Sequence, residues 1–145
     1  MKKADVDAVL REFEDVFREH GFSGSKGDYR LPGGIRLKVR LDRHGWDPDL
    51  GWGLLFTAED TAAADSLGNV PVESRLQVTP ATLDKVLDKK ALGALYADNP
   101  RVRSRLRSGW FAFEHVDRLR AVLRVVLGPA LLHVRAWAES IRSAT

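Results

Sequence analysis

The alternation of apolar and polar positions predicts helices towards both ends of the chain and strands between them. Residues 4–20 carry apolar side chains every three or four positions, which predicts an amphipathic helix with one buried stripe. Residues 35–41 alternate between apolar and charged side chains, and this period of two is typical of a strand with one face in water. Shorter runs at 28–31, 52–57 and 72–78 predict three more strands.

Turn residues indicate how these strands are joined. Pro32, Gly33 and Gly34 predict a hairpin, whereas residues 21–27 are rich in glycine and serine and are expected to form a flexible connection. Short links between consecutive strands favour an antiparallel meander. In the strand at 72–78, the core face is expected to carry Val72, Leu76 and Val78.

The C-terminal half is expected to be mainly helical. Thr79 and Pro80 suit the start of a helix that would run to Asn99 and Pro100. A second apolar stripe covers 114–127, and Gly128 and Pro129 are expected to break or kink it before a last helix over 131–141. Residues 110–113 suit a short edge strand or a loop plug.

These elements predict a single α+β domain over residues 1–145. The expected architecture is an antiparallel sheet of about four strands, packed by an N-terminal helix and C-terminal helices in two layers. The length of 145 residues and the hydrophobic content of 44% suit one domain with a substantial core.

Composition limits where the protein is expected to act. The chain has no cysteine, which excludes disulfides and thiolate chemistry and favours a reducing compartment. The N-terminus lacks an apolar signal segment, and the apolar run at 121–132 is interrupted and shorter than the ~20 residues of a membrane span. The sequence therefore predicts a cytoplasmic protein with no membrane partner.

Charge is distributed unevenly along the chain. Residues 1–72 contain 10 Lys and Arg against 13 Asp and Glu, whereas residues 73–145 contain 13 against 7. A basic half suits an anionic partner, either a nucleic acid or an acidic protein, and it equally suits a solvated surface.

Arginines recur at alternate positions in one segment of the basic half. Arg101, Arg103, Arg105 and Arg107 precede Trp110, and Arg118, Arg120 and Arg124 follow on the next predicted helix. An extended segment would gather these forked donors for phosphates or carboxylates, and an aromatic ring among them suits stacking on single-stranded nucleic acid. A helical segment would instead spread the arginines around its axis.

Residues 42–49 carry the densest candidate chemistry. Asp42, His44, Asp47 and Asp49 could ligate a divalent cation or support acid–base catalysis, but aspartate with glycine and proline is also the usual composition of a turn. The four histidines do not form a helical metal pair, and no phosphate loop or nucleophile elbow is present. No cofactor and no resident metal are expected.

The order of features resembles the bacterial family called domain of unknown function 4304. The resemblance rests on an opening helix that ends at His20, Gly21 and Phe22, on the alternating strand at 35–41 and on the aromatic segment at 110–113. It spans most of the chain and implies no activity and no catalytic residue.

Scattered polar groups and the absence of a catalytic motif favour a non-enzymatic protein-binding domain, of the immunity or regulatory type. Exposed aromatics and arginines dominate interface energetics. The expected contact residues are Arg101, Arg103, Arg105, Arg107, Trp46, Trp52 and Trp110. Two alternatives stay open: a nucleic-acid-binding module using residues 101–124, and a metal-assisted hydrolase at 42–49.

Overall fold

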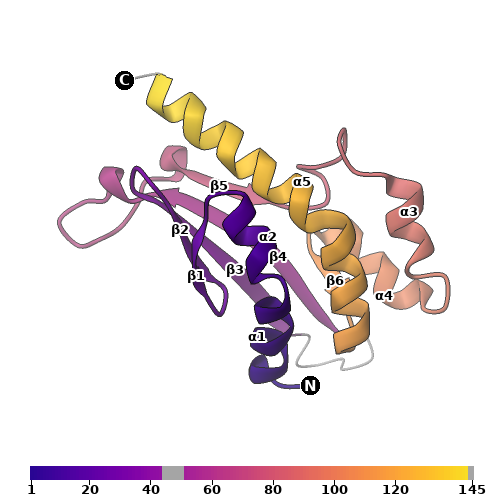
Figure 1. Ribbon diagram of the computed structural model, residues 1–145. Coiled ribbons are helices and arrows are strands. Elements are labelled where there is room, and N and C mark those ends of the chain that lie inside the picture. The colour runs from indigo at the N-terminus through magenta and orange to yellow at the C-terminus, as the bar shows by residue number, and fades with distance from the viewer. Residues whose placement is uncertain (44–50, 144–145) are drawn as a thin grey trace.

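The computed structural model describes residues 1–43 and 51–143, and it has an antiparallel sheet with helices against one face (Figure 1). The predicted α+β class is confirmed, with six strands in place of about four. The strands are β1 Ser23–Ser25, β2 Asp28–Leu31, β3 Ile35–Arg43, β4 Trp52–Asp60, β5 Arg75–Val78 and β6 Phe111–Phe113.

β4 is the centre of the sheet. β3 pairs with it along its whole length, from Ile35 opposite Asp60 to Arg43 opposite Trp52. The other edge of β4 is shared by β5 and the short β6, so of the two alternatives for 110–113 the structure has the edge strand, at Phe111–Phe113. Strands buried on one face need an apolar partner layer, and the helices supply it.

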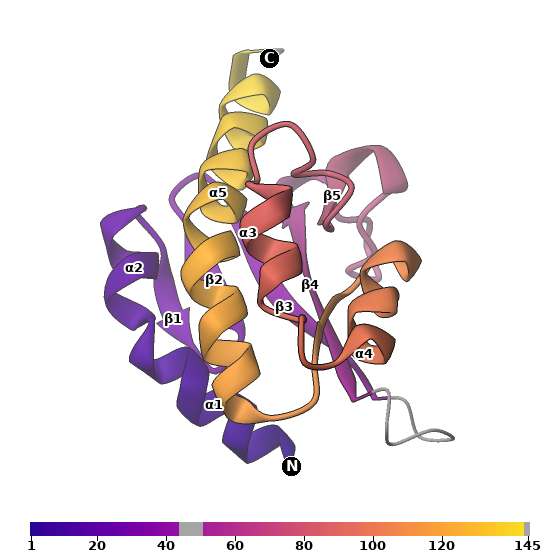
Figure 2. The ribbon, with the colours of Figure 1, turned by 90° about the vertical axis from the view of Figure 1, so that its right-hand side faces the viewer.

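Three helices form that layer: α1 Lys3–Glu12, α2 Glu14–Glu19 and the long α5 Val116–Ser143 (Figure 1). Figure 2 shows them on one side of the sheet, with α3 Lys89–Ala94 and α4 Pro100–Ser104 beside its β5–β6 edge. The core between the layers includes Phe17 stacked on Tyr29, with ring centroids 3.8 Å apart.

α5 is continuous, so of the predicted break or kink at Gly128 and Pro129 the break is wrong, and residues 131–141 do not form a separate last helix. Pro129 lies inside the helix, where a missing N–H and a ring clash cost roughly 3 kcal/mol. The apolar stripe nevertheless continues in phase through the proline. Its buried apolar members are Leu119, Val122, Leu123, Val126, Leu127, Ala130, Leu131, Val134 and Ala138. Their packing on the sheet explains why the helix continues.

By length and composition, α5 is also the one helix in the described part of the chain that could cross a membrane. The expectation from residues 121–132 missed this, because it counted Arg124, Gly128 and Pro129 as interruptions of the apolar run. In the fold, α5 is the central core helix, with its buried stripe against the sheet and against α1. The structure is therefore compatible with a soluble protein.

Several predicted boundaries are wrong. The N-terminal helix is interrupted at Phe13, whose φ of −105° and ψ of 8° separate α1 from α2. The connection at 21–27 contains β1, which forms a hairpin with β2. This happens because Lys26 and Gly27 adopt positive φ values of 53° and 83°, which a tight turn requires.

The segment after β4 departs furthest from its pattern. Val72 is 76% exposed in a 3-10 turn, Val72–Ser74, and only the end of the predicted strand pairs as β5. The helix expected from Thr79 is reduced to turns followed by α3, which Asp88 caps through the backbone N–H of Ala91. Leu83 and Leu87 are buried, whereas Val86 between them is 64% exposed.

Candidate binding surfaces

The arginine segment is helical, so the side chains of Arg101, Arg103 and Arg105 do not form one row. Pro100 occupies the first turn of α4, and the Asn99 side chain accepts a hydrogen bond of 3.3 Å from the backbone N–H of Val102. A 3-10 helix, η4 Arg105–Ser108, continues the turn and contains Arg107. Arg101 and Arg103 are exposed, while Arg105 points inward, as the helical alternative predicts.

Arg105 has a structural role, because its guanidinium connects η4 to the sheet. Its side chain is 4% exposed, and its Nη2 lies 2.6 Å from Oδ2 of Asp42, while Nη1 donates to the Gly51 carbonyl at 3.3 Å. A Cβ at Gly53 would lie 3.1 Å from Nη2 of Arg105, so this glycine makes room for the guanidinium. Arg105 joins η4 to β3 and is not available to a partner.

The predicted aromatic contacts are also largely packed. Trp110 is half-buried over Gly53. A Cβ added at Gly53 would lie 2.7 Å from the Cβ of Trp110, so the tryptophan packs here because the glycine has no side chain. Trp52 lies half-buried with its ring centroid 6.2 Å from that of Phe113, and the guanidinium of Arg43 sits 4.5 Å over it. Trp46 lies outside the described residues.

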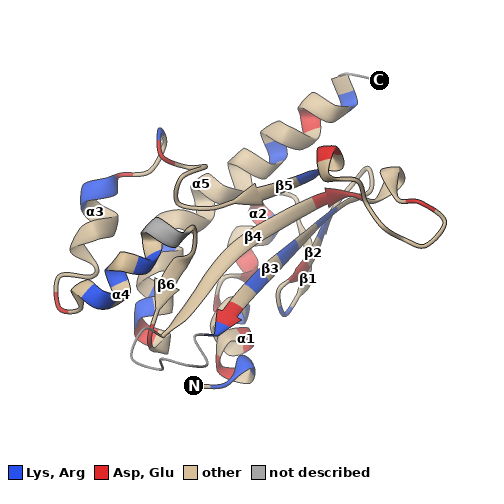
Figure 3. Cartoon of the chain, turned by 180° about the vertical axis from the view of Figure 1, so that it is seen from behind, with Lys and Arg blue, Asp and Glu red and all other residues tan. Residues whose placement is uncertain are grey.

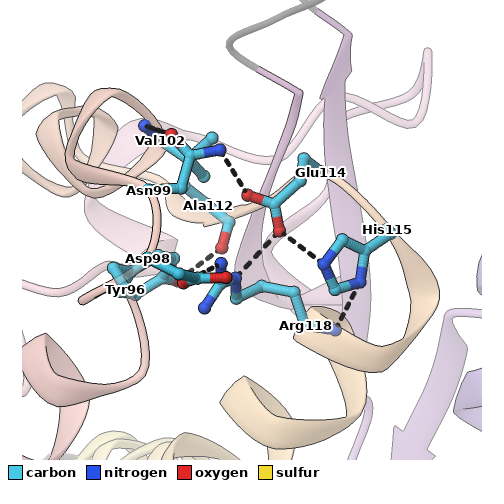
Figure 4. Close-up of polar contacts among 8 residues, drawn as sticks. All are labelled: Tyr96, Asp98, Asn99, Val102, Ala112, Glu114, His115 and Arg118. Atoms are coloured by element: carbon cyan, nitrogen blue, oxygen red, sulfur yellow. Dashed lines mark hydrogen bonds and ion pairs between the residues drawn. The ribbon is translucent and has the colours of Figure 1, made fainter.

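Arg118 is the centre of a polar cluster (Figure 4). This guanidinium is 7% exposed and contacts Glu114 at 2.8 Å and Asp98 at 2.6 Å, above the ring of Tyr96 at 5.0 Å. The contact with Arg118 holds the pKa of Asp98 below its usual range, and burial raises the pKa of Tyr96. The cluster ties the segment before α4 to the start of α5.

His115 caps α5 within the same cluster. Its Nδ1 accepts a hydrogen bond of 3.1 Å from the backbone N–H of Arg118, and its Nε2 lies 3.1 Å from Oε1 of Glu114 (Figure 4). An accepting Nδ1 requires the neutral imidazole with the proton on Nε2. The Asn99 amide donates to Glu114 as well, at 3.0 Å. Glu114 therefore contacts both the guanidinium of Arg118 and the side chains that cap α4 and α5, whereas Asp98 contacts the guanidinium.

Of the four candidate metal ligands at residues 42–49, the structure describes Asp42 alone. Asp42 is described and pairs with Arg105, whereas His44, Asp47 and Asp49 lie outside the described residues. Across residues 1–43 and 51–143, no group of three or more potential protein ligands is placed to hold a metal ion.

A cationic surface lies on the sheet face opposite α1, α2 and α5, here called the outer sheet face and defined by Asp28, Arg30, Arg36, Lys38 and Arg40. Figure 3 shows this face from behind, with Lys and Arg along β2 and β3 and no described helix over them. Arg36 pairs with Asp28 at 2.7 Å and lowers the pKa of that carboxyl. Neither Arg30, Lys38 nor Arg40 forms an ion pair with another described residue.

The outer sheet face is not in the half of the chain where the charge counts predicted a basic surface. Its cations come from the first half of the chain, which is acidic by count, while several arginines of the basic half, such as Arg105 and Arg118, pair with acids within the fold. Arg120, for example, pairs with Glu12 at 2.8 Å and with Asp117 at 2.7 Å. The alternation at 35–41 already predicted outward-facing basic side chains, and that signal could have identified this surface.

No protein-family model, curated protein or solved structure shows a significant match to the chain. The resemblance to domain of unknown function 4304 therefore stays a prediction.

Proposed function

We propose that the chain is a non-enzymatic protein-binding domain, of an immunity or regulatory type, that recognises an acidic surface of another protein. The observation that carries this proposal is the outer sheet face, where Arg30, Lys38 and Arg40 form no ion pair with another residue that the structure describes. Solvated cations of this kind steer an acidic partner and form charge-assisted contacts with it. A cytoplasmic location is part of the proposal and rests on the absence of cysteine.

Protein is favoured over nucleic acid as the partner. Binding of single strands typically combines a basic groove with aromatic platforms. The described tryptophans, Trp52, Trp110 and Trp137, are all partly buried, and the outer sheet face is defined by charged side chains. The arginines of 101–124 offer less support for nucleic acid than an extended segment would, because Arg105, Arg118 and Arg120 are paired within the chain.

The proposal is tested with the purified product of each adjacent gene, by titration calorimetry and size-exclusion chromatography. A stable complex is expected, and exchanging Arg40 for Glu should weaken it at least tenfold, a loss of about 1.4 kcal/mol. The matched control is Arg135→Glu, which makes the same charge change at an exposed position of α5.

Equal weakening by both variants would show that net charge, and not the outer sheet face, drives association. Binding of a single-stranded oligonucleotide with a steep salt dependence, in the absence of any protein complex, would replace the proposal with the nucleic-acid alternative. Turnover of a substrate by the purified chain would reject a non-enzymatic role.

A further inference from the structure

β3 extends beyond the strand that pairs with it. β2 pairs with Ile35 to Lys38, and the backbone N–H of Val39 then donates to the Gly27 carbonyl at 2.8 Å. β2 begins only at Asp28, because the turn at Lys26 and Gly27 joins it to β1, so β2 does not continue alongside residues 40–43 of β3. Residues 40–43 consequently have β4 on one side and no described strand on the other.

The open side of β3 presents backbone hydrogen-bonding groups. In an antiparallel strand, the N–H and C=O of one residue point to the same side, and successive residues alternate. The N–H of Val39 points towards β2, so those of Leu41 and Arg43 point to the open side. Unpaired backbone groups of this kind are a template on which an extended chain can add as a strand.

A hollow of about 560 Å³ lies at this place. It is lined by Lys3, Lys26, Gly27, Asp28, Lys38, Val39, Arg40, Leu41 and Arg43. Five of these residues are cationic, and the single acid, Asp28, already pairs with Arg36. Lys3 pairs with Asp7 at 3.0 Å, so the remaining four cations give the hollow an excess of positive charge beside a backbone edge that no described strand covers.

The pleat of β3 specifies which side chains an added strand would meet. Val39 and Leu41 lie on the helix side and pack against the core, whereas Lys38 and Arg40 lie on the outer sheet face. Asp42 also lies on the outer side, but Arg105 neutralises it. An antiparallel strand would therefore place apolar side chains opposite Leu41 and acidic ones beside Arg40.

We infer that residues 40–43 bind an extended segment of alternating acidic and apolar residues, which adds to the sheet as an antiparallel strand. This inference deepens the proposed function, because it names the form of the acidic partner at the same basic strand. The backbone edge supplies affinity and the alternation of side chains supplies specificity.

The probe is a fluorescein-labelled peptide, Glu-Val repeated three times with blocked ends, and the readout is fluorescence polarisation. Binding is expected for this peptide and not for a block peptide of three glutamates followed by three valines. Arg40→Gln should weaken binding about tenfold through the loss of a charge-assisted contact. Arg135→Gln is the matched control, because Arg135 is an exposed arginine of α5 that lies outside the outer sheet face and does not line the hollow.

Backbone methylation separates strand addition from simple charge attraction. Valines opposite Leu41 and Arg43 would direct their N–H groups at β3, while the glutamates direct theirs away. Methylating the valine nitrogens should abolish binding, and methylating the glutamate nitrogens should leave it within about twofold.

Equal binding of the alternating, block and methylated peptides would overturn the inference. So would the absence of peptide binding, which would identify the cations at 40–43 as a device that protects the edge from pairing. Either result leaves the proposed function standing if Arg40→Glu still weakens a protein complex. The proposed function fails separately if no protein partner responds to that substitution.

Discussion

Two groups of cations in this fold differ in what they contact. Arg105 and Arg118 are nearly buried and each lies within 3 Å of a carboxylate oxygen. Arg30, Lys38 and Arg40, on the outer sheet face, have no ion-pair partner among the described residues. The first group lies in the half of the chain that is basic by count, and the second lies in the acidic half. The density of arginine along a sequence therefore does not locate a binding surface.

Desolvation explains the difference. A buried charge is costly unless it is paired and hydrogen-bonded, so the inward-pointing arginines must recruit acids from elsewhere in the fold. Asp42 on β3 serves Arg105 in this way. A strand cation facing water carries no such requirement and keeps its charge available. Mutations in the two groups should consequently affect different properties, namely stability for the first and binding for the second.

The largest effect is expected for Arg118→Met, which keeps the apolar stem and removes the guanidinium. Glu114 is 17% exposed and would lose its principal cation, so the free energy of unfolding should fall by about 3 kcal/mol. Urea unfolding followed by circular dichroism measures the change. Arg124→Met, at an exposed position of the same helix, should stay within about 0.5 kcal/mol. Equal effects would show that the cluster in Figure 4 contributes little.

A smaller loss, about 2 kcal/mol, is expected for Arg105→Met, because its partner Asp42 is 42% exposed and can be solvated when left alone. Asp42→Asn should cost less than half as much in the same urea titration, since the amide still accepts from Arg105. A double-mutant cycle between the two positions gives their coupling. Additive effects would contradict the assignment of Arg105 as a tie between η4 and β3.

The sheet could be predicted well from sequence because its signal is local. The alternation at residues 35–41 fixes which side chains face the helices, and the paired geometry of β3 follows from it. The stripe of α5 was also visible, but Pro129 outweighed it in the prediction. Whether packing overcomes a proline depends on the facing sheet, which a local pattern does not contain.

The fate of the predicted contact residues was less predictable, because it depends on contacts between residues that are far apart in the sequence. Arg105 and Asp42 are 63 residues apart, and no local pattern indicates that they meet. The same holds for Trp110, whose packing requires the bare backbone of Gly53. For the strand cations the sequence had the necessary signal, since residues of one parity on an amphipathic strand face outward.

Acid should weaken the fold further, by a modest amount. The pKa values of Asp98 and Asp28 are lowered by contacts with Arg118 and Arg36, respectively. A carboxyl with a depressed pKa in the folded state contributes stability above the unfolded pKa, and that contribution is lost as pH falls through the folded value. Stability should thus decline from about pH 4 downward.

Urea unfolding across the acid range tests this for the wild type and for Asp98→Asn. The variant should show a shallower decline, because one of the two linked carboxyls is gone. Asp5→Asn is a control, at an exposed acid on α1 that contacts its own helix start. An unchanged pH slope in Asp98→Asn would mean that the ion pair with Arg118 is not maintained in solution.

Arg40 is expected to contribute least to the stability of the fold, although we propose that it contributes most to binding. Arg40→Gln removes an exposed cation with no described ion-pair partner, so the free energy of unfolding should change by less than about 0.5 kcal/mol. Arg36→Gln, in contrast, breaks an exposed pair with Asp28 and should cost about 0.2–1 kcal/mol. Differential scanning calorimetry of both variants decides the order. If Arg40→Gln were as destabilising as Arg105→Met, the strand cations would also hold the fold, and the division between buried ties and free binding groups would fail.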